Sequence, residues 1–455
     1  MNNNKLHVEF GDAEQDLSRR QLIKTGVSCA AYLSATQLLR LATGDVAYGQ
    51  ADTSSPKKRL IWINMSGGWD ILEATDPKQN STAGIDMAYG WGAAQQLAGS
   101  QDVRIGRWLP RIAGHGADVV VLRGMTMGTT SHDAGHVYMD TGVLSNTGRV
   151  NAASVPAIVA AESNAVIPLI QLSGGSEPRT DRALPRNLST VRAENLDLYR
   201  KMYPSDAKSK ETSLLLLDHL KESTSRVQSA QGSTDRLNAL ISAESRIREQ
   251  IQSNIGGQLE VKPADRIKFN APFANMPAGM GMARRPDGLI DSFALALKLL
   301  QANLVTCVNL GIGGFDTHAN QDRSLEPLLT GFDIALGVFI DELKASGQLD
   351  STLIVLFSDF GRTPKINGNM GRDHWPVGGA IMIGGGIAGG RAVGESDDKL
   401  LSKEIDLTTG ASAAGGKQLS PALLAGSVLE LTVGSAVLRK RGYLQSSAAL
   451  TRLRS

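Results

Sequence analysis

Side chains that could bind a metal ion or an anion gather between Ser358 and Gly386. This stretch reads SDFGRTPKINGNMGRDHWPVGGAIMIGGG and follows the apolar run LIVLF. It contains the carboxylate of Asp359, the guanidinium of Arg362 and the imidazole of His374. Carboxylates and imidazoles are ligands for zinc and manganese, and a guanidinium matches the oxygens of phosphate or sulfate. The stretch therefore predicts that Asp359 and His374 contribute to a metal or anion site after a buried strand.

Two other apolar runs also lead into acidic residues. Asp70 closes RLIWINMSGGWD, and GGFDTHANQ places Asp316 two residues before His318. In an extended segment, that spacing directs both side chains to one side. Carboxylates gathered at one edge of a sheet raise each other's pKa, and a bound cation removes this cost. The repetition indicates a metal site, although a single Asp-x-His is more often a solvated surface pair.

Six apolar runs predict strands buried on both faces, because they are continuous rather than alternating. They occupy residues 59–70, 117–128, 166–175, 303–316, 351–361 and 378–386. Helical patterns lie between them in SHDAGHVYMDTGVL, DGLIDSFALALKLLQA and LEPLLTGFDIALGVFIDELKASG. This alternation predicts an α/β fold with a mostly parallel central sheet and helices on both faces. Such sheets bind ligands beyond the carboxyl ends of their strands.

One long segment, residues 198–258, breaks the alternation because it is charged and poor in strand signals. It reads as two or three long amphipathic helices between loops rich in Pro, Gly and Arg. We expect a helical insertion packed beside the main domain, since the segment has apolar stripes and no long low-complexity run. The alternative is an interaction arm for a partner.

The N-terminal segment LSRRQLIK resembles a twin-arginine export signal, in which paired arginines precede a hydrophobic residue. A weakly apolar stretch follows, but Arg40 interrupts it and it is too polar to remain in a bilayer. Small residues in VAYGQAD then suit cleavage. We therefore expect a signal peptide at residues 1–51, export by the twin-arginine translocase, no stable transmembrane anchor, and a periplasmic or secreted domain at residues 52–455. The alternative is an amphipathic helix with a chance arginine pair.

Net charge and cysteine content indicate which partners and which disulfides to expect. The formal net charge is +2, so nothing in the overall charge indicates a nucleic-acid partner. The chain has two cysteines, Cys29 and Cys307. Cleavage of the signal would remove Cys29 and leave Cys307 without a partner for an internal disulfide. We expect Cys307 to be a buried thiol on a strand.

These motifs together resemble a bacterial family of exported proteins of unknown function. The blocks that carry the resemblance are GGWD, TSHDAGHVYMDTG, GGFDTH and LIVLFSDFGRTP followed by NGNMGRDHWP and IMIGGGIAGG. They extend over nearly the whole chain after the signal. The family is itself distantly similar to the alkaline phosphatase and sulfatase superfamily. The resemblance implies an alkaline-phosphatase-like fold and a metal-assisted hydrolase centre for phosphate or sulfate esters.

The resemblance also implies roles for particular residues. The matching metal ligands are Asp70, Asp316, His318, Asp359 and His374. They would hold one or two divalent ions of zinc, manganese or calcium. The nucleophile of the superfamily begins the helix after the second strand, where this chain offers Thr129, Thr130 and Ser131. A helix N-terminus favours an anion, and the alternative role for Ser131 is a helix N-cap.

Two departures from the superfamily pattern affect the expected metal site. Phe360 stands where an imidazole is usual, and Asp316 and His318 are closer in sequence than usual. His132 or His136 could supply the missing ligand. The alternatives are a site for one ion, or a site without a metal.

Arg362 is the expected anion clamp, and its alternative role is a salt bridge to Asp359 or Asp373. Two functions remain open from the sequence. The first is an exported metal-dependent hydrolase, in which Ser131 or Thr130 attacks a small anionic phosphate or sulfate ester. The second is a non-catalytic exported protein that binds a glycan or a partner at the cell surface, and Phe360 is the residue that favours it.

Overall fold

The computed structural model describes residues 58–79, 84–145, 150, 152–179, 190–192, 206–231, 235–274, 286–441, 443, 450 and 453. The expected export signal at residues 1–51, with Cys29, lies outside the described residues. Among the described helices, none is both long and apolar enough to cross a membrane.

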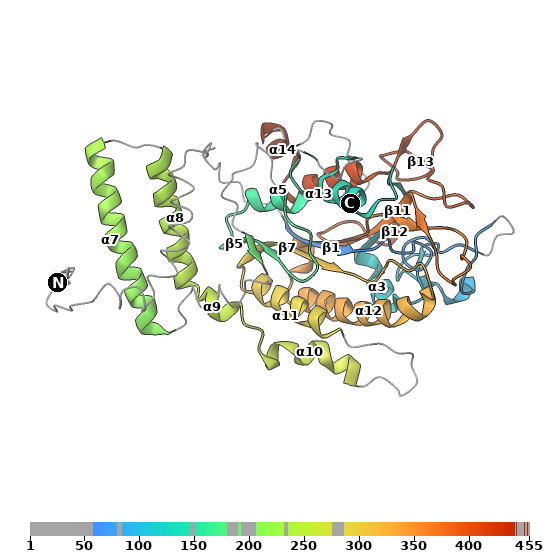
Figure 1. Ribbon diagram of the computed structural model, residues 1–455, viewed down its shortest axis with the longest axis horizontal. Helices are drawn as coiled ribbons and strands as arrows, with labels where there is room; N and C mark the ends of the chain where they lie inside the picture. Colours follow the sequence, from blue (N-terminus) through green and yellow to red (C-terminus); the bar gives the residue numbers. More distant parts are fainter. Residues whose placement is uncertain are drawn as a thin grey trace. The chain divides into compact units, whose positions relative to one another are not determined.

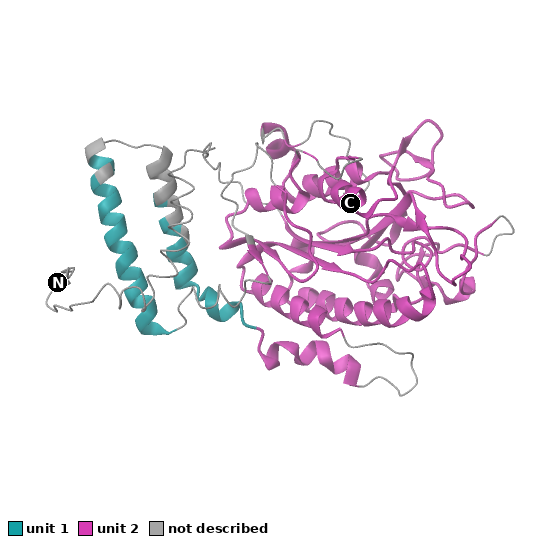
Figure 2. Cartoon of the chain, viewed as in Figure 1, with its two compact units in different colours: residues 1–50, 185–187, 194–260 teal, residues 51–184, 188–193, 261–455 magenta. Residues whose placement is uncertain are grey.

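The chain divides into two compact units, which Figure 2 colours teal and magenta. Unit 1 comprises residues 1–50, 185–187 and 194–260, and unit 2 comprises residues 51–184, 188–193 and 261–455. The segment expected as a helical insertion, residues 198–258, falls within unit 1. The described helices of unit 1 are α7 (Ala207–Gln231), α8 (Asp235–Gln252) and α9 (Ile255–Gln258).

Helices α7 and α8 contact each other through polar and apolar side chains. Arg248 of α8 lies 2.8 Å from Asp218 of α7 and 2.7 Å from Glu244, one turn earlier in α8. Leu217 of α7 and Ile247 of α8 are buried. The amphipathic pattern in this segment therefore reflects a pair of helices that bury apolar side chains.

An eight-stranded sheet forms the centre of unit 2. Strand β11 runs antiparallel to β4 and β8, and the other neighbouring strands run parallel. The predicted mostly parallel sheet is therefore confirmed, and one antiparallel strand is added to it. The order is β12 (Arg391–Val393), β4 (Val119–Thr126), β11 (Val377–Gly384), β8 (Thr352–Phe357), β1 (Arg59–Met65), β7 (Val305–Ile312), β5 (Ile167–Gln171) and β6 (Thr190–Arg192).

Helices cover both faces of this sheet, as predicted (Figure 1). On one face lie α5 (Val155–Ala161), α13 (Pro421–Thr432) and α14 (Ser435–Arg441). On the other lie α3 (Pro110–Gly114), α10 (Pro263–Ala274), α11 (Asp287–Gln301) and α12 (Gln321–Ala345). Helix α4 (His132–Thr141) follows β4 and packs against α13.

Short elements complete unit 2. The paired strands are β2 (Gln95–Gln96) with β3 (Arg104–Ile105), β9 (Gly361–Arg362) with β10 (His374–Trp375), and β13 (Glu404–Ile405) with β14 (Lys417–Gln418). The 3-10 turns are η2 (Trp91–Ala93), η3 (Gly116–Asp118) and η5 (Leu349–Ser351).

The three central strands place the candidate site. Strand β1 pairs with β7 on one side and with β8 on the other, and side chains on both faces of these strands are buried. Cys307 of β7 is one of them, as expected for a buried strand thiol. Because all three strands run parallel, the loops after Met65, Ile312 and Phe357 leave the same edge of the sheet.

Candidate metal centre

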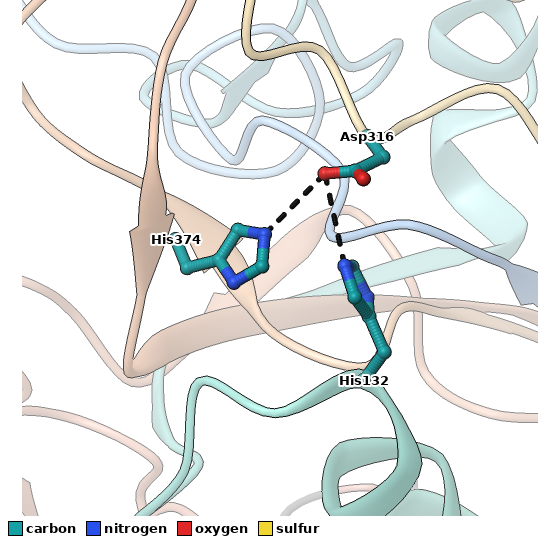
Figure 3. A group of neighbouring side chains, drawn as sticks. All are labelled: His132, Asp316 and His374. Carbon is teal, nitrogen blue, oxygen red and sulfur yellow. Dashed lines mark hydrogen bonds and ion pairs between the residues drawn. The ribbon is translucent and has the colours of Figure 1, made fainter.

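Three side chains from separate segments converge beyond this edge of the sheet (Figure 3). His132 is the first residue of α4, Asp316 follows β7, and His374 belongs to β10. Their ligand atoms all lie within 4.8 Å of one another. The Nε2 atom of His374 lies 3.3 Å from Asp316 Oδ1, and that of His132 lies 3.7 Å from the same oxygen. These three residues form the candidate metal centre.

A third imidazole borders the candidate metal centre. The Nε2 atom of His318 lies 3.0 Å from Asp316 Oδ1 and 3.0 Å from His374 Nε2. Its side chain is 46% exposed, so it stands at the solvent side of the group. The predicted pair of Asp316 and His318 is therefore brought together with His374.

Each of the three imidazoles has its Nδ1 atom beside an oxygen. His132 Nδ1 bonds to Asp359, His318 Nδ1 lies 2.8 Å from Asp373 Oδ1, and His374 Nδ1 lies 2.9 Å from the Thr130 carbonyl. An oxygen acceptor favours the tautomer with the proton on Nδ1, which leaves the Nε2 lone pair free. All three Nε2 atoms then face the Asp316 carboxylate. This arrangement is typical of histidines that are oriented as metal ligands.

Asp359 is fully buried and orients His132. Its Oδ1 atom accepts hydrogen bonds from the backbone N–H groups of Gly67, at 3.0 Å, and Gly68, at 2.7 Å, and from the Ser358 hydroxyl at 2.8 Å. Burial acts to raise the pKa of Asp359, but the His132 hydrogen bond and the charge of His136 outweigh it and lower that pKa. The predicted ligand Asp359 therefore lies one hydrogen bond outside the candidate metal centre.

The glycine pair after β1 makes these contacts sterically feasible. Gly67 and Gly68 adopt φ values of +115° and +76°, which L-residues rarely adopt. A Cβ atom on Gly67 would lie 2.5 Å from the Asp316 nitrogen, and one on Gly68 would lie 2.6 Å from the Phe360 ring. The GG of the sequence therefore permits the close approach of three loops.

Asp70 lies outside the candidate metal centre. It is buried, and its Oδ1 atom accepts from the Leu72 N–H at 2.8 Å. Its Oδ2 atom accepts from Gln321 Nε2 at 2.6 Å and lies 3.0 Å from Arg372 Nε. The carboxylate thus joins the loop after β1 to the start of α12 and to the loop before β10.

Arg362 is also buried, and its donors are directed to the chain itself. Nε donates to the Gly68 carbonyl at 2.7 Å, and Nη2 donates to the Gly67 carbonyl and to Asp316 Oδ1, the latter at 2.6 Å. Nη1 donates to the carbonyl of Arg372 at 3.0 Å. The ion pair is with Asp316 rather than with Asp359 or Asp373. Burial acts to raise the pKa of Asp316, but the bond and charge of Arg362 lower it overall.

Phe360 forms an apolar support for two imidazoles. Its ring is fully buried, with its centroid 4.7 Å from that of His132 and 4.4 Å from that of His374. Phe360 therefore packs against two of the three members of the candidate metal centre.

The three hydroxyl residues before α4 differ in their contacts. Ser131 is the exposed N-cap residue, but its side chain makes no capping hydrogen bond. Thr129 Oγ1 accepts from the Ser131 N–H at 3.1 Å. Thr130 is exposed, and its carbonyl holds His374. Ser131 therefore precedes the first residue of α4 as an exposed residue whose hydroxyl does not cap the helix.

A row of polar contacts between α4 and β1 was not predicted. Side chains four residues apart on α4 meet side chains two residues apart on β1. Asp140 Oδ1 accepts from Trp62 Nε1 at 3.0 Å, and burial raises the pKa of this carboxyl group. His136 Nδ1 lies 2.9 Å from Asn64 Nδ2, and His136 Nε2 lies 3.2 Å from Ser66 Oγ. The spacing of His132, His136 and Asp140 was the available signal, since it places them on one helix face.

Comparison with protein families gives one match. The family described as "Protein of unknown function (DUF1501)" matches residues 57–406, which is most of the chain. A search of curated proteins gives no significant match.

Several solved structures are similar to this chain at low identity. A protein in the alkaline phosphatase superfamily from Vibrio parahaemolyticus is 10% identical, with TM-score 0.34, over 87% of this chain and 74% of its own. The PsFucS1 sulfatase from Pseudoalteromonas sp. is 12% identical, with TM-score 0.34, over 91% and 72%. The lipoteichoic acid synthase LtaP from Listeria monocytogenes is 9% identical, with TM-score 0.32, over 88% and 78%. We therefore base the function on the site itself.

Proposed function

This chain belongs to the DUF1501 family of proteins of unknown function, and we propose that it is an exported metal-dependent hydrolase of phosphate or sulfate esters. The observation that carries the proposal is the set of three imidazoles whose Nε2 atoms face the Asp316 carboxylate while oxygens hold their Nδ1 atoms. Residues that only pair with one another on a surface do not need such orientation.

The residues at the candidate metal centre fit a divalent ion of borderline softness. His132, Asp316 and His374 would hold the ion, with His318 beside them. Imidazole nitrogens with one carboxylate suit zinc, and also manganese, whereas calcium takes oxygen ligands alone. A bound ion would polarise the ester and lower the pKa of a nucleophilic hydroxyl.

The chain's own groups would then position an anionic ester. The start of α4 adjoins His132, and a helix N-terminus favours negative charge. We place the attacking hydroxyl at Ser131, because it is exposed, adjacent to His132 and free of a capping bond; Thr130 is the alternative.

Arg362 has a different role in this proposal from the predicted anion clamp. Its guanidinium is buried, and its hydrogen bonds go to three backbone carbonyls and to Asp316. We propose that Arg362 positions Asp316 and the glycine turn, and that the ester oxygens meet the metal and the start of α4 instead.

The alternative of a non-catalytic binding protein depended on Phe360. The Phe360 ring packs against the imidazoles of His132 and His374, so it supports two candidate metal ligands. This contact favours the hydrolase over the binding protein.

A substrate panel tests the proposed function. We expect the mature protein loaded with Zn²⁺ or Mn²⁺ to hydrolyse at least one ester among aryl phosphate monoesters, aryl phosphate diesters and aryl sulfates. Asp316→Asn should abolish this turnover, while Asp341→Asn, on an exposed side chain that pairs with His115, is the matched control. Wild-type protein that is loaded with metal but inactive on the whole panel would contradict the proposal.

A further inference from the structure

We propose that Ser66, His136 and Asn64 form a second hydrolytic group, in which Ser66 is a nucleophile for neutral carboxylic esters. His136 lies on α4, and the two other residues lie at the end of β1 and just after it, two positions apart. None of the three is a member of the candidate metal centre, although His136 and His132 both lie beside Asp359. The proposed reaction at Ser66 needs no metal ion.

The distances match a nucleophile, a base and an orienting group. Ser66 Oγ lies 3.2 Å from His136 Nε2, and His136 Nδ1 lies 2.9 Å from the Asn64 amide. A hydroxyl within hydrogen-bond reach of an imidazole, which a third group orients, is the arrangement that activates serine. Ser66 and His136 are both half-buried, so a small ester can reach them.

The Asn64 amide determines which nitrogen of His136 carries the proton. Its Oδ1 atom is buried and has no hydrogen-bond partner among the described residues, while its Nδ2 atom faces His136 Nδ1. With the amide in this orientation, Nδ1 accepts and the proton lies on Nε2. A half-turn of the amide makes Oδ1 the acceptor of Nδ1–H, and Nε2 then accepts the proton of Ser66. Attack by Ser66 therefore requires the amide orientation that places Asn64 Oδ1 against His136 Nδ1.

The surrounding charge favours a neutral ester. The charged side chain that contacts this group is Asp359, whose Oδ2 atom lies 3.7 Å from His136 Nε2. Among the described residues, no lysine or arginine forms an ion pair or hydrogen bond with the side chain of Ser66, His136 or Asn64. A carboxylate next to the base stabilises the imidazolium that forms during attack and disfavours an anionic substrate.

The reaction balances without a further reagent. Ser66 Oγ bonds to the acyl carbon as its proton passes to His136 Nε2, and that proton then leaves with the alcohol as the ester C–O bond breaks. Water next attacks the acyl-serine, His136 takes a proton from the water, and the Ser66 Oγ–acyl bond breaks. Ser66 recovers its proton from His136, and the acid is released.

Acylation by p-nitrophenyl acetate tests the proposal on the mature protein in the presence of a chelator, where the metal-dependent activity is silent. We expect a burst of nitrophenol and an acetyl adduct that peptide mass mapping places on Ser66. Ser66→Ala should remove the adduct, and His136→Gln should slow acylation by about 100-fold or more, as expected for loss of a general base. Ser346→Ala and His115→Gln, which change other residues of unit 2, are the matched controls.

Asn64→Asp tests the orienting role of residue 64 independently of the Ser66 and His136 variants, which could unfold. A carboxylate can only accept, so it fixes the proton of His136 on Nδ1, and acylation should be as fast as in wild type or faster. An adduct on Ser131 instead of Ser66, no adduct at all, or loss of acylation in a folded Asn64→Asp protein would overturn the proposal.

Discussion

At the residue scale, the main feature of the candidate metal centre is that three histidine side chains share one orientation. His132, His318 and His374 come from different segments, yet each has Nε2 near Asp316 and Nδ1 near an oxygen. The oxygens come from Asp359, Asp373 and the Thr130 backbone. Three histidines from different segments that share one orientation are the feature from which we propose a shared metal ion.

Substitution of Asp359 should weaken metal binding without removing it. In Asp359→Asn the carboxylate that fixes His132 is lost while the ligands remain, so we expect about 10- to 100-fold lower affinity. Competition with a chromophoric chelator measures the affinity. Asp316→Ala, which removes a proposed ligand, should abolish binding. Equal affinities for Asp359→Asn and wild type would show that Asp359 does not orient a ligand.

Substitution of Ser131 separates a nucleophile from a helix cap. Ser131→Ala should lower ester hydrolysis by several orders of magnitude because the covalent step is lost. An N-cap serine would cost about 1 kcal/mol of stability, but this hydroxyl makes no capping bond, so the melting temperature should not change. Thr130→Ala is the paired variant. Full activity in both variants would place the nucleophile elsewhere.

At the scale of elements, the start of α4, the loop after β7 and strand β10 supply the three members of the candidate metal centre, and the loops after β1 and β8 support them. The sequence predicted all six long strands, because each is a continuous apolar run between glycine-rich turns. It did not predict that β11 runs antiparallel, because an apolar run carries no information on direction. The short strands β6 and β12 have too few residues to produce a pattern.

The candidate site was predictable where the signal is local. Asp316 and His318 lie in the loop after β7, His374 is the first residue of the short strand β10, and the structure brings the three together. Asp70 also follows a strand, but Gln321 and Arg372, which are distant in sequence, hold its carboxylate elsewhere. Hydrogen-bond and ion-pair partners that are this distant in the sequence cannot be predicted from residue type and spacing.

The glycine turn after β1 should not tolerate a side chain. Gly67→Ala adds a Cβ at 2.5 Å from the Asp316 nitrogen and at a φ of +115°, so we expect a loss of stability above about 1 kcal/mol. Metal affinity should fall as well, because Asp316 and Asp359 both contact this turn. Gly90→Ala is the control, since its Cβ would have nothing within 4 Å. Denaturant unfolding of both variants measures the difference, and equal stabilities would contradict this account.

Export belongs to the scale of the whole molecule. The twin-arginine segment lies outside the described residues, so its role remains a prediction from the sequence. Replacement of Arg19 and Arg20 by lysine should leave full-length precursor in the cytoplasm, because the paired guanidinium signal is lost. Immunoblots of cell fractions measure this. Normal processing of the variant would exclude twin-arginine export.

The central claim, that one edge of the sheet holds a divalent ion, is tested most directly by elemental analysis of the freshly purified mature protein. We predict about one zinc or manganese ion per chain, as three imidazoles with one carboxylate would bind. Chelation should remove the ion and lower the melting temperature, since a ligand that binds the native state stabilises it. Protein that contains no divalent ion, takes up none on incubation with Zn²⁺ or Mn²⁺, and keeps its melting temperature in chelator would contradict the claim.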